Sequence, residues 1–251
     1  MSLFDVRPLK TMEFPPLLAE IPTPPKELWA VGRIPPLELK LLTVVGSRQY
    51  TTYGKQVVEK LIGDLVGYPI GIVSGLALGI DGLAHEAALK AKLYTVAVPG
   101  SGLDESVLYP ASHRQLARKI IENGGGLISE LPPEAKAALW TFPQRNRLMA
   151  GMSQATLLIE ASEKSGTLIT ARMTVDYNRE LLVVPGSIFS KNSLGTHQFL
   201  KLGATPITRA EDILSVLGID QTVAQKTQSF VPLFDLSPLE KQIIKLLFEP
   251  T

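Results

Sequence analysis

The sequence predicts an α/β fold of the Rossmann-like, doubly wound type, with a mostly parallel sheet covered by helices on both faces. Six short apolar runs recur along the chain, and nearly continuous runs of this kind are typical of strands buried on both faces. Segments with apolar residues at helical spacing lie between them, and such alternation indicates a parallel sheet. The expected strands are residues 41–46, 69–74, 93–98, 125–129, 155–160 and 180–184.

The helices between these strands are expected from their apolar spacing. In the first helix, Val57, Val58, Leu61, Ile62 and Leu65 recur every three or four positions, which places them on one face. The alanine-rich second segment and the three later ones show comparable patterns. The expected helices are residues 53–66, 83–91, 113–122, 167–177 and 210–217, with a further helix beginning near Pro143.

The chain is expected to divide into four parts. Residues 1–40 are rich in proline, which fixes φ and removes a hydrogen-bond donor, so we expect extended chain with at most short helical turns, packed on the main domain. Residues 41–217 form the main domain, and 218–236 lose periodicity and are expected to be a linker. At 237–251, the run Ser237-Pro238-Leu239-Glu240 is a helix N-terminal signal. We expect the first helix of a truncated small domain there; the alternative is a helix docked on the body.

Composition excludes several classes of protein. The chain has 251 residues, 45% of them hydrophobic, but no apolar run long enough to cross a membrane. Its first ten residues carry charges where a signal peptide needs an apolar core, so a cytoplasmic protein is expected. With no cysteine, disulfides and cysteine-ligated metals are excluded. The net charge of +1 argues against a dedicated duplex-DNA binder and limits any nucleic-acid site to a local cluster of cations.

Four of the strands end in small, glycine-bearing loops that open helix-like segments. Glycine lets a phosphate approach the backbone, and the free N–H groups and dipole of a helix N-terminus favour an anion. Such loops on one sheet line a single crevice at the carboxyl ends of the strands. The four loops lie in LLTVVGSR (41–48), IGIVSGLALGID (70–81), YTVAVPGSGLD (94–104) and LLIEASEKSGTLIT (157–170).

Known nucleotide motifs do not fit these loops. A dinucleotide site needs G-x-G-x-x-G after the first strand, and the Gly100-Ser101-Gly102 run lacks its third glycine. No Walker loop is present either. Asp81 and His85, four residues apart on an expected helix, could pair or hold a metal, but without a second ligand cluster we expect only a structural hydrogen bond, no metal and no cofactor.

Two segments carry cations suited to phosphates. Arg48 follows the first strand, where a guanidinium beside exposed amides can clamp a phosphate; the alternative is an ordinary surface arginine. In FPQRNRLMAG (142–151), Arg145 and Arg147 fall in the first turn of a helix, where the macrodipole disfavours cations, and residues that break a local rule are often functional. With Phe142 beside them they have the aromatic and basic character that single-stranded nucleic acid requires.

The order of these motifs resembles the DprA/Smf family (DNA-processing protein A) over roughly residues 14–217. The motifs are, in order, VGSR, SGLALGID, VPGSGLDESVLYP, LISELPP, FPQRNRLMAG, EASEKSGTLITA, VVPG and GTHQFLKLGA. The resemblance implies a Rossmann-like domain that binds single-stranded DNA without sequence preference, protects incoming DNA in natural transformation and loads the RecA recombinase. It also implies a homodimer without catalytic activity and, in many members, a C-terminal winged-helix domain.

The resemblance also implies site residues. We expect the DNA or phosphate site to use Gly46, Ser47, Arg48, Ser74, Gly75, Gly100, Gly102, Phe142, Arg145, Arg147, Lys164, Ser165, Gly166 and Thr167. We expect the dimer and RecA surface near Phe199, Leu200, Leu202 and Ile207.

The chain departs from the family pattern at three places. Leu78 stands where the family often has arginine, EAKAALW replaces the glycine and proline after LISE-x-P-P, and MTVDYN follows the SGTLITA helix start. These departures predict weaker DNA binding on an unchanged fold, and they keep open a protein scaffold whose DNA pocket has decayed. A second alternative is a nucleotide-hydrolysing enzyme related to the phosphoribohydrolases, although Thr170 stands where their motif carries an acid.

Overall fold

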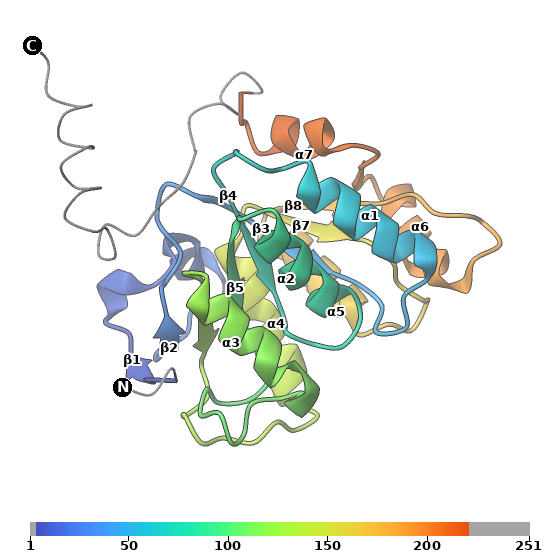
Figure 1. The fold of residues 1–251 in the computed structure, drawn as a ribbon. Coiled ribbons are helices and arrows are strands. Elements are labelled where there is room, and N and C mark those ends of the chain that lie inside the picture. The colour runs from blue at the N-terminus through green and yellow to red at the C-terminus, as the bar shows by residue number, and fades with distance from the viewer. Residues whose placement is uncertain (1–3, 221–251) are drawn as a thin grey trace, which may run out of the picture.

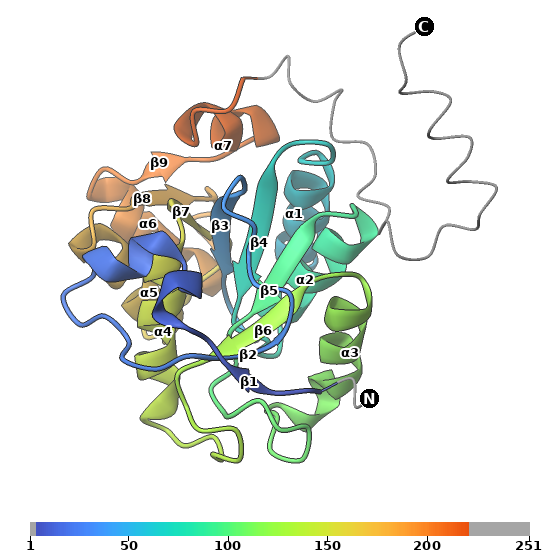
Figure 2. The same cartoon turned by 90° about the vertical axis from the view of Figure 1, so that its left-hand side faces the viewer.

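The computed structural model describes residues 4–220, and these residues build a nine-stranded sheet with helices on both faces (Figures 1 and 2). The strands are β1 (Arg7–Pro8), β2 (Trp29–Gly32), β3 (Lys40–Val45), β4 (Ile70–Ser74), β5 (Tyr94–Ala97), β6 (Gly126–Ser129), β7 (Ala155–Leu158), β8 (Glu180–Val183) and β9 (Thr205–Pro206). The helices are α1 (Thr52–Gly63), α2 (Ile80–Lys90), α3 (Arg114–Glu122), α4 (Thr141–Met152), α5 (Thr167–Asp176), α6 (Leu194–Lys201) and α7 (Ala210–Val216).

The strand order creates a topological switch point in the middle of the sheet. The order is β1-β2-β6-β5-β4-β3-β7-β8-β9, and every pair from β6 to β9 is parallel. The chain therefore winds outward from β3 to β6 on one side, crosses over through α4, and winds outward from β7 to β9 on the other. Ligands of such sheets bind at the carboxyl edge where the order reverses, which here is between β3 and β7.

Residues of the central strands alternate between two helical layers. On β3, Leu42 and Val44 join a core cluster with α1, α2 and α7, while Leu41 and Val45 join a second cluster with α4, α5 and α6. The α3 helix packs on a third cluster beside β5 and β6. Figure 2 shows α1, α2 and α3 on one side of the sheet and α4, α5 and α6 on the other. Burial on both faces explains why these strands appear as continuous apolar runs in the sequence.

The proline-rich segment adds two strands to the same sheet. β2 pairs with β6 and β1 pairs with β2, and both pairings are antiparallel. Two 3₁₀ helices, η1 (Thr11–Glu13) and η2 (Pro16–Glu20), connect them. Leu18 and Ile21 are buried against α4, where Gly151 leaves room for both side chains. These contacts hold the far face of α4 and so fix its position over the sheet.

The structure confirms the fold class and all six expected strands, with shifts of a residue or two at their ends. It adds three short strands, β1, β2 and β9, and one helix, α6, that sequence periodicity did not predict. Nearly all of the expected linker (218–236) and the whole expected C-terminal helix (237–251) lie outside the described residues. Within residues 4–220, no helix is long and apolar enough to cross a membrane.

Candidate functional site

A cleft of about 660 Å³ lies at the carboxyl edge of the sheet, at the switch point between β3 and β7. Its walls come from the loops that follow these strands, from the starts of α4 and α5, and from the 3₁₀ turn η4 (Lys191–Ser193) after β8. The lining includes Gly46, Ser47, Arg48, Gln49, Asp81, Phe142, Arg145, Asn146, Ser162, Ser165, Gly166, Thr167, Thr170, Lys191 and Asn192.

An exposed arginine and two aromatic rings stand at one end of this cleft. The Arg48 guanidinium carbon lies 5.5 Å from the centre of the Phe142 ring, a cation–π arrangement. Phe142 in turn lies 5.7 Å from the Tyr109 ring, tilted by 56°. The cation–π contact orients the Arg48 side chain. Its attraction of about 0.5–1 kcal/mol offsets the conformational entropy that the side chain loses. Arg48 is exposed, so its charge stays accessible to a ligand.

The close approach of the first loop to α2 depends on glycine. A Cβ at Gly46 would lie 2.6 Å from the Ile80 side chain, and one at Gly79, where φ is +86°, would lie 2.4 Å from the carbonyl oxygen of Ser47. The chain at Gly79 is left-handed, a region that side chains other than glycine rarely adopt. Both glycines therefore set the position of Arg48 at the edge of the cleft.

The N-terminus of α5 faces the cleft without a competing carboxylate. Its N-cap, Gly166, has no side chain, the Ser165 hydroxyl accepts from the amide of Thr167 (3.3 Å), and the first turn holds no acidic residue. Thr167 donates a hydrogen bond from Oγ1 to the carbonyl oxygen of Gly46 (3.1 Å), which ties this turn to the β3 loop. The partial positive charge of the helix end is therefore directed at the same space as Arg48.

The neighbouring helix α1 is different, because its N-terminus already has an anion. Glu160, buried after β7, accepts hydrogen bonds from the backbone N–H of Thr51 (2.9 Å) and from the Thr51 hydroxyl (2.5 Å). Thr51 itself caps α1 through the amide of Gly54. The N-terminus of α1 is thus occupied by a carboxylate, whereas the first turn of α5 holds no acidic residue.

A buried arginine holds the base of the cleft together. Arg145 is only 6% exposed, and its guanidinium donates to the carbonyl oxygens of Gly75 and Val98, which follow β4 and β5. Asp81 accepts from the amide of Gly75 (3.1 Å). We call these four residues, Gly75, Asp81, Val98 and Arg145, the floor. Their polar groups are paired with one another, as buried polar groups must be.

The titratable groups of this region are shifted by burial. Burial raises the pKa of the Asp81 carboxyl, and the nearby Arg145 guanidinium opposes that shift. Burial lowers the pKa of Arg145 to about 10, so the guanidinium is still charged at neutral pH. His85, one turn along α2 from Asp81, is buried and its pKa is lowered to about 3. It hydrogen-bonds Thr95 through Nδ1 (2.8 Å), so Asp81 and His85 each make a structural hydrogen bond with a different partner.

The predicted site residues fall into three groups. Seven line the cleft besides Arg145: Gly46, Ser47, Arg48, Phe142, Ser165, Gly166 and Thr167. Ser74, Gly75, Gly100 and Gly102 lie beneath or beside it as packing positions. The Ser74 hydroxyl donates to the carbonyl of Val44 (2.7 Å), and a Cβ at Gly100 would meet the Phe142 ring at 2.6 Å. Gly102 packs under the carbonyl oxygens of Pro132 and Pro133.

Two predicted cations stand apart from the lining. Arg147 pairs with the carboxylate of Glu130 and donates to the carbonyl of Thr23, so its charge is directed at the N-terminal segment. Lys164 is exposed on the turn before α5 and is not among the lining residues. The two arginines of FPQRNR therefore point in different directions, although they sit two positions apart on one helix.

Two of the four residues expected at the dimer surface are buried in the core. Phe199 is 6% exposed and Ile207 is 1% exposed, because each packs into one of the two main core clusters. As core residues they offer little surface to a second chain. Leu200 is half-buried, and Leu202, at the end of α6, is 80% exposed. A contact in this region would rest on Leu202 and its exposed neighbours.

Sequence reasoning missed the far side of the cleft. Lys191 and Asn192 line it from the loop after β8, and the Asn192 side-chain amide donates to the carbonyl of Gln49 (2.7 Å). Tyr109, which contacts Phe142, was also missed. The available signal was position alone, since a loop at the carboxyl end of a parallel strand faces the same edge as the others.

Together these features define an α/β protein with a cleft lined by cations, glycines and an aromatic ring at the switch point of a Rossmann-like sheet. Among the residues described, no group of three or more His, Asp or Glu side chains is placed to hold a metal ion. The chain belongs to the family of DNA recombination-mediator protein A, whose model matches residues 6–218.

Relatives and solved structures agree with this assignment. Protein Smf of Escherichia coli is 38% identical over 204 residues, which cover 81% of this chain and 54% of that protein. The chain thus spans about half the length of this relative. The X-ray structure of DprA from Streptococcus pneumoniae matches with a TM-score of 0.78 at 34% identity, over 85% of this chain and 75% of that one. The structure of DprA from Helicobacter pylori, which concerns its single-stranded DNA binding mode, matches with a TM-score of 0.75 at 29% identity. The match covers 85% of this chain and 96% of that one.

Proposed function

We propose that this protein binds single-stranded DNA without sequence preference in the cleft between β3 and β7. One observation carries the proposal: exposed Arg48 is stacked on Phe142 in the same cleft as the N-terminus of α5, whose first turn holds no acidic residue. A cation and a helix N-terminus suit phosphates, and aromatic faces suit bases of any identity. The single-stranded DNA binding of the H. pylori relative supports the same ligand.

A single strand suits this cleft better than a duplex. The aromatic rings of Phe142 and Tyr109 can stack only on bases that are exposed, and a duplex keeps its bases paired and stacked on one another. The net charge of +1 supplies no broad basic face for two phosphate backbones. A few cations placed in one cleft are enough for one backbone.

We further propose that the protein acts by binding, without catalysis, and that it delivers the strand to a RecA-type recombinase as a homodimer. The description of the family as a recombination mediator supports the RecA-type recombinase as a partner. Exposed Leu202, at the end of α6, supports a protein contact there because a large apolar side chain in water gains from being covered.

The test is fluorescence anisotropy of a labelled oligo-dT, single-stranded or annealed to its complement, across a salt series. We expect strong preference for the single strand and a fall of log K with log salt, with a slope of about 0.7 per neutralised phosphate. Equal affinity for the duplex, or no binding at low salt, would contradict the proposal.

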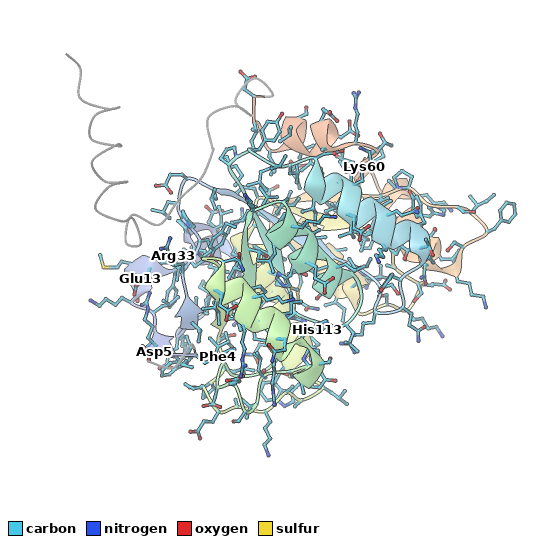
Figure 3. All side chains as sticks on the ribbon, in the orientation of Figure 1. Phe4, Asp5, Glu13, Arg33, Lys60 and His113 are labelled. Carbon is cyan, nitrogen blue, oxygen red and sulfur yellow. The ribbon has the colours of Figure 1, made fainter. Side chains whose placement is uncertain are left out.

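A matched pair of variants localises the binding. Arg33 is exposed like Arg48 but follows β2 at the amino edge of the parallel strands, where Gly32 pairs with Gly126. Figure 3 shows Arg33 far from His113, which lies at the carboxyl edge and hydrogen-bonds the carbonyl of Leu76 after β4. Arg48→Ala should weaken binding, whereas Arg33→Ala removes the same charge and should not.

A further inference from the structure

A strongly exposed aromatic ring stands next to the cleft, on the side opposite Phe142. Phe189 is 91% exposed on the loop between β8 and η4, and Ile188 beside it is 75% exposed. Two residues further along, Lys191 and Asn192 line the cleft. The loop extends from the body next to α6 (Figure 1). An apolar ring this exposed gains from a partner that can cover it.

Hydrogen bonds fix this loop to the first loop of the cleft. The Asn192 side-chain amide donates to the carbonyl of Gln49 (2.7 Å), and the Tyr53 hydroxyl donates to the carbonyl of Pro185 (2.7 Å). Tyr50, between these two anchors on the first loop, is 42% exposed. The base of the Phe189 loop is therefore held in one position against the first loop of the cleft. A ligand that binds to Phe189 then has less of the loop to order, which lowers the entropic cost of binding.

The two ends of the cleft are alike in chemistry. Phe142 stands at one end, packed on Gly100 after β5, and Arg48 reaches its ring from the loop after β3. Phe189 and Lys191 stand at the other, after β8. The sheet order β5-β4-β3-β7-β8 places four strand spacings between these ends. At about 4.8 Å per spacing, the ends are about 19 Å apart.

We propose that Phe189, with Lys191 and Tyr50, forms a second base-stacking platform where single-stranded nucleic acid leaves the cleft. The inference rests on the proposed function, since it extends the same strand path. A stacked strand rises about 3.4 Å per nucleotide, so about six nucleotides span the two platforms. Bases at the two ends of the bound segment contact different rings, and the intervening phosphates pass Arg48 and the start of α5.

Continuity with the cleft favours nucleic acid over a protein partner. Two residues after Phe189 comes Lys191, a cation that lines the cleft, and the aromatic Tyr50 lies on the loop that carries Arg48. Aromatic faces alternating with cations match the bases and phosphates of a single strand.

The test uses oligo-dT carrying one 2-aminopurine, whose fluorescence falls when it stacks on an aromatic ring, placed in turn at each end. In the wild type we expect quenching at both ends of a 6-mer, the length that spans the two platforms; the affinity is measured with a 12-mer. Phe189→Ala should restore fluorescence at one end and Phe142→Ala at the other. Phe189→Ala should also weaken binding of the 12-mer at least about fivefold, and leave a 4-mer, too short to reach both platforms, with the affinity of the wild type.

Two further variants complete the design. Phe189→Trp keeps an aromatic ring and should retain quenching. Leu37→Ala removes a 77% exposed side chain before β3, at the amino edge of the sheet, and should change nothing. Since Phe189 makes almost no packing contact, its substitution should leave folding intact.

The outcomes separate this inference from the proposed function. If the wild type binds no oligomer, the proposed function fails. If Arg48→Ala weakens binding but Phe189→Ala changes neither the quenching nor the 12-mer affinity, only the second platform is overturned. If Phe189→Ala instead shifts the self-association measured by sedimentation without affecting DNA, the loop is a protein contact and the inference is likewise overturned.

Discussion

The floor and the rim of the cleft use arginine in opposite ways. The floor comprises Gly75, Asp81, Val98 and Arg145, and its charges are buried and paired within the protein. The rim, by which we mean the more accessible side chains Arg48, Tyr109, Phe142 and Lys191, has its charges and rings directed outward. The difference shows that one predicted site arginine can hold the shape of the cleft, while another, in a nearby loop, keeps its charge accessible.

The largest expected effect is on stability, from removing the floor arginine. Arg145→Ala leaves the Asp81 carboxylate without its guanidinium and the carbonyls of Gly75 and Val98 without a donor. Each buried acceptor left without a donor costs about 1–3 kcal/mol, so the two carbonyls together cost about 2–6 kcal/mol. Urea denaturation should show this loss, while Arg48→Ala at the rim should change the free energy of unfolding by less than about 0.5 kcal/mol.

Equal stability losses for Arg145→Ala and Arg48→Ala would contradict the distinction between a structural floor and an exposed rim. A double variant sharpens the test. Asp81→Asn in the Arg145→Ala background removes the uncompensated carboxylate, so it should recover part of the lost stability. No recovery would mean that Asp81 is not the residue that Arg145 neutralises.

The next effect concerns the backbone that joins floor to rim. Gly79 and Gly203 both have positive φ, +86° and +98°, but a Cβ at Gly79 would meet backbone atoms of Ser47 and Arg48, whereas one at Gly203 would meet nothing within 4 Å. Gly79→Ala should therefore cost about 2–3 kcal/mol more than Gly203→Ala. Because the contact includes Arg48, Gly79→Ala should also weaken oligo-dT binding, and Gly203→Ala should not. Similar costs in both would show that strain in φ alone decides.

Acidification should lower the stability of the protein through His85, which is buried one turn along α2 from the floor residue Asp81. The pKa of His85 is about 3 in the folded protein, against about 6.5 when unfolded, so the unfolded chain binds a proton that the folded one excludes. The stability that this provides is complete above pH 6.5 and is lost as pH falls towards 3. Between pH 7.5 and 5 we expect a loss of about 2 kcal/mol from this group. His85→Gln should flatten that part of the stability–pH curve measured by denaturation, and an unchanged slope would refute the assignment.

Much of this architecture follows from the sequence, because the strands are buried on both faces. The apolar run that contains Leu42 and Val44 predicted a strand buried on both faces. The loop after such a parallel strand lies at the carboxyl edge of the sheet. The crevice at the carboxyl edge, with Arg48 beside it, was predicted from the loop motifs, whereas the switch point required the strand order of the structure.

Other features depend on packing that no local pattern encodes. Arg145 and Arg147 look equivalent in the sequence, and only the way α4 packs decides that Arg145 turns under the cleft while Arg147 meets Glu130. β2 forms because β6, about a hundred residues later, offers an antiparallel edge. Lys191 belongs to a loop without periodicity, so its place in the cleft depends on the whole sheet order.

The smallest expected effect is the one most specific to the rim. Arg48→Ala should weaken oligo-dT binding about tenfold, which corresponds to about 1.4 kcal/mol, and reduce the salt slope by about 0.7, since one phosphate contact is lost. Arg147→Ala, whose charge is directed at Glu130 and Thr23, should leave both the affinity and the slope unchanged. A reduced slope in Arg147→Ala would mean that the strand also passes over the N-terminal segment, and that the boundary of the binding surface lies beyond the rim.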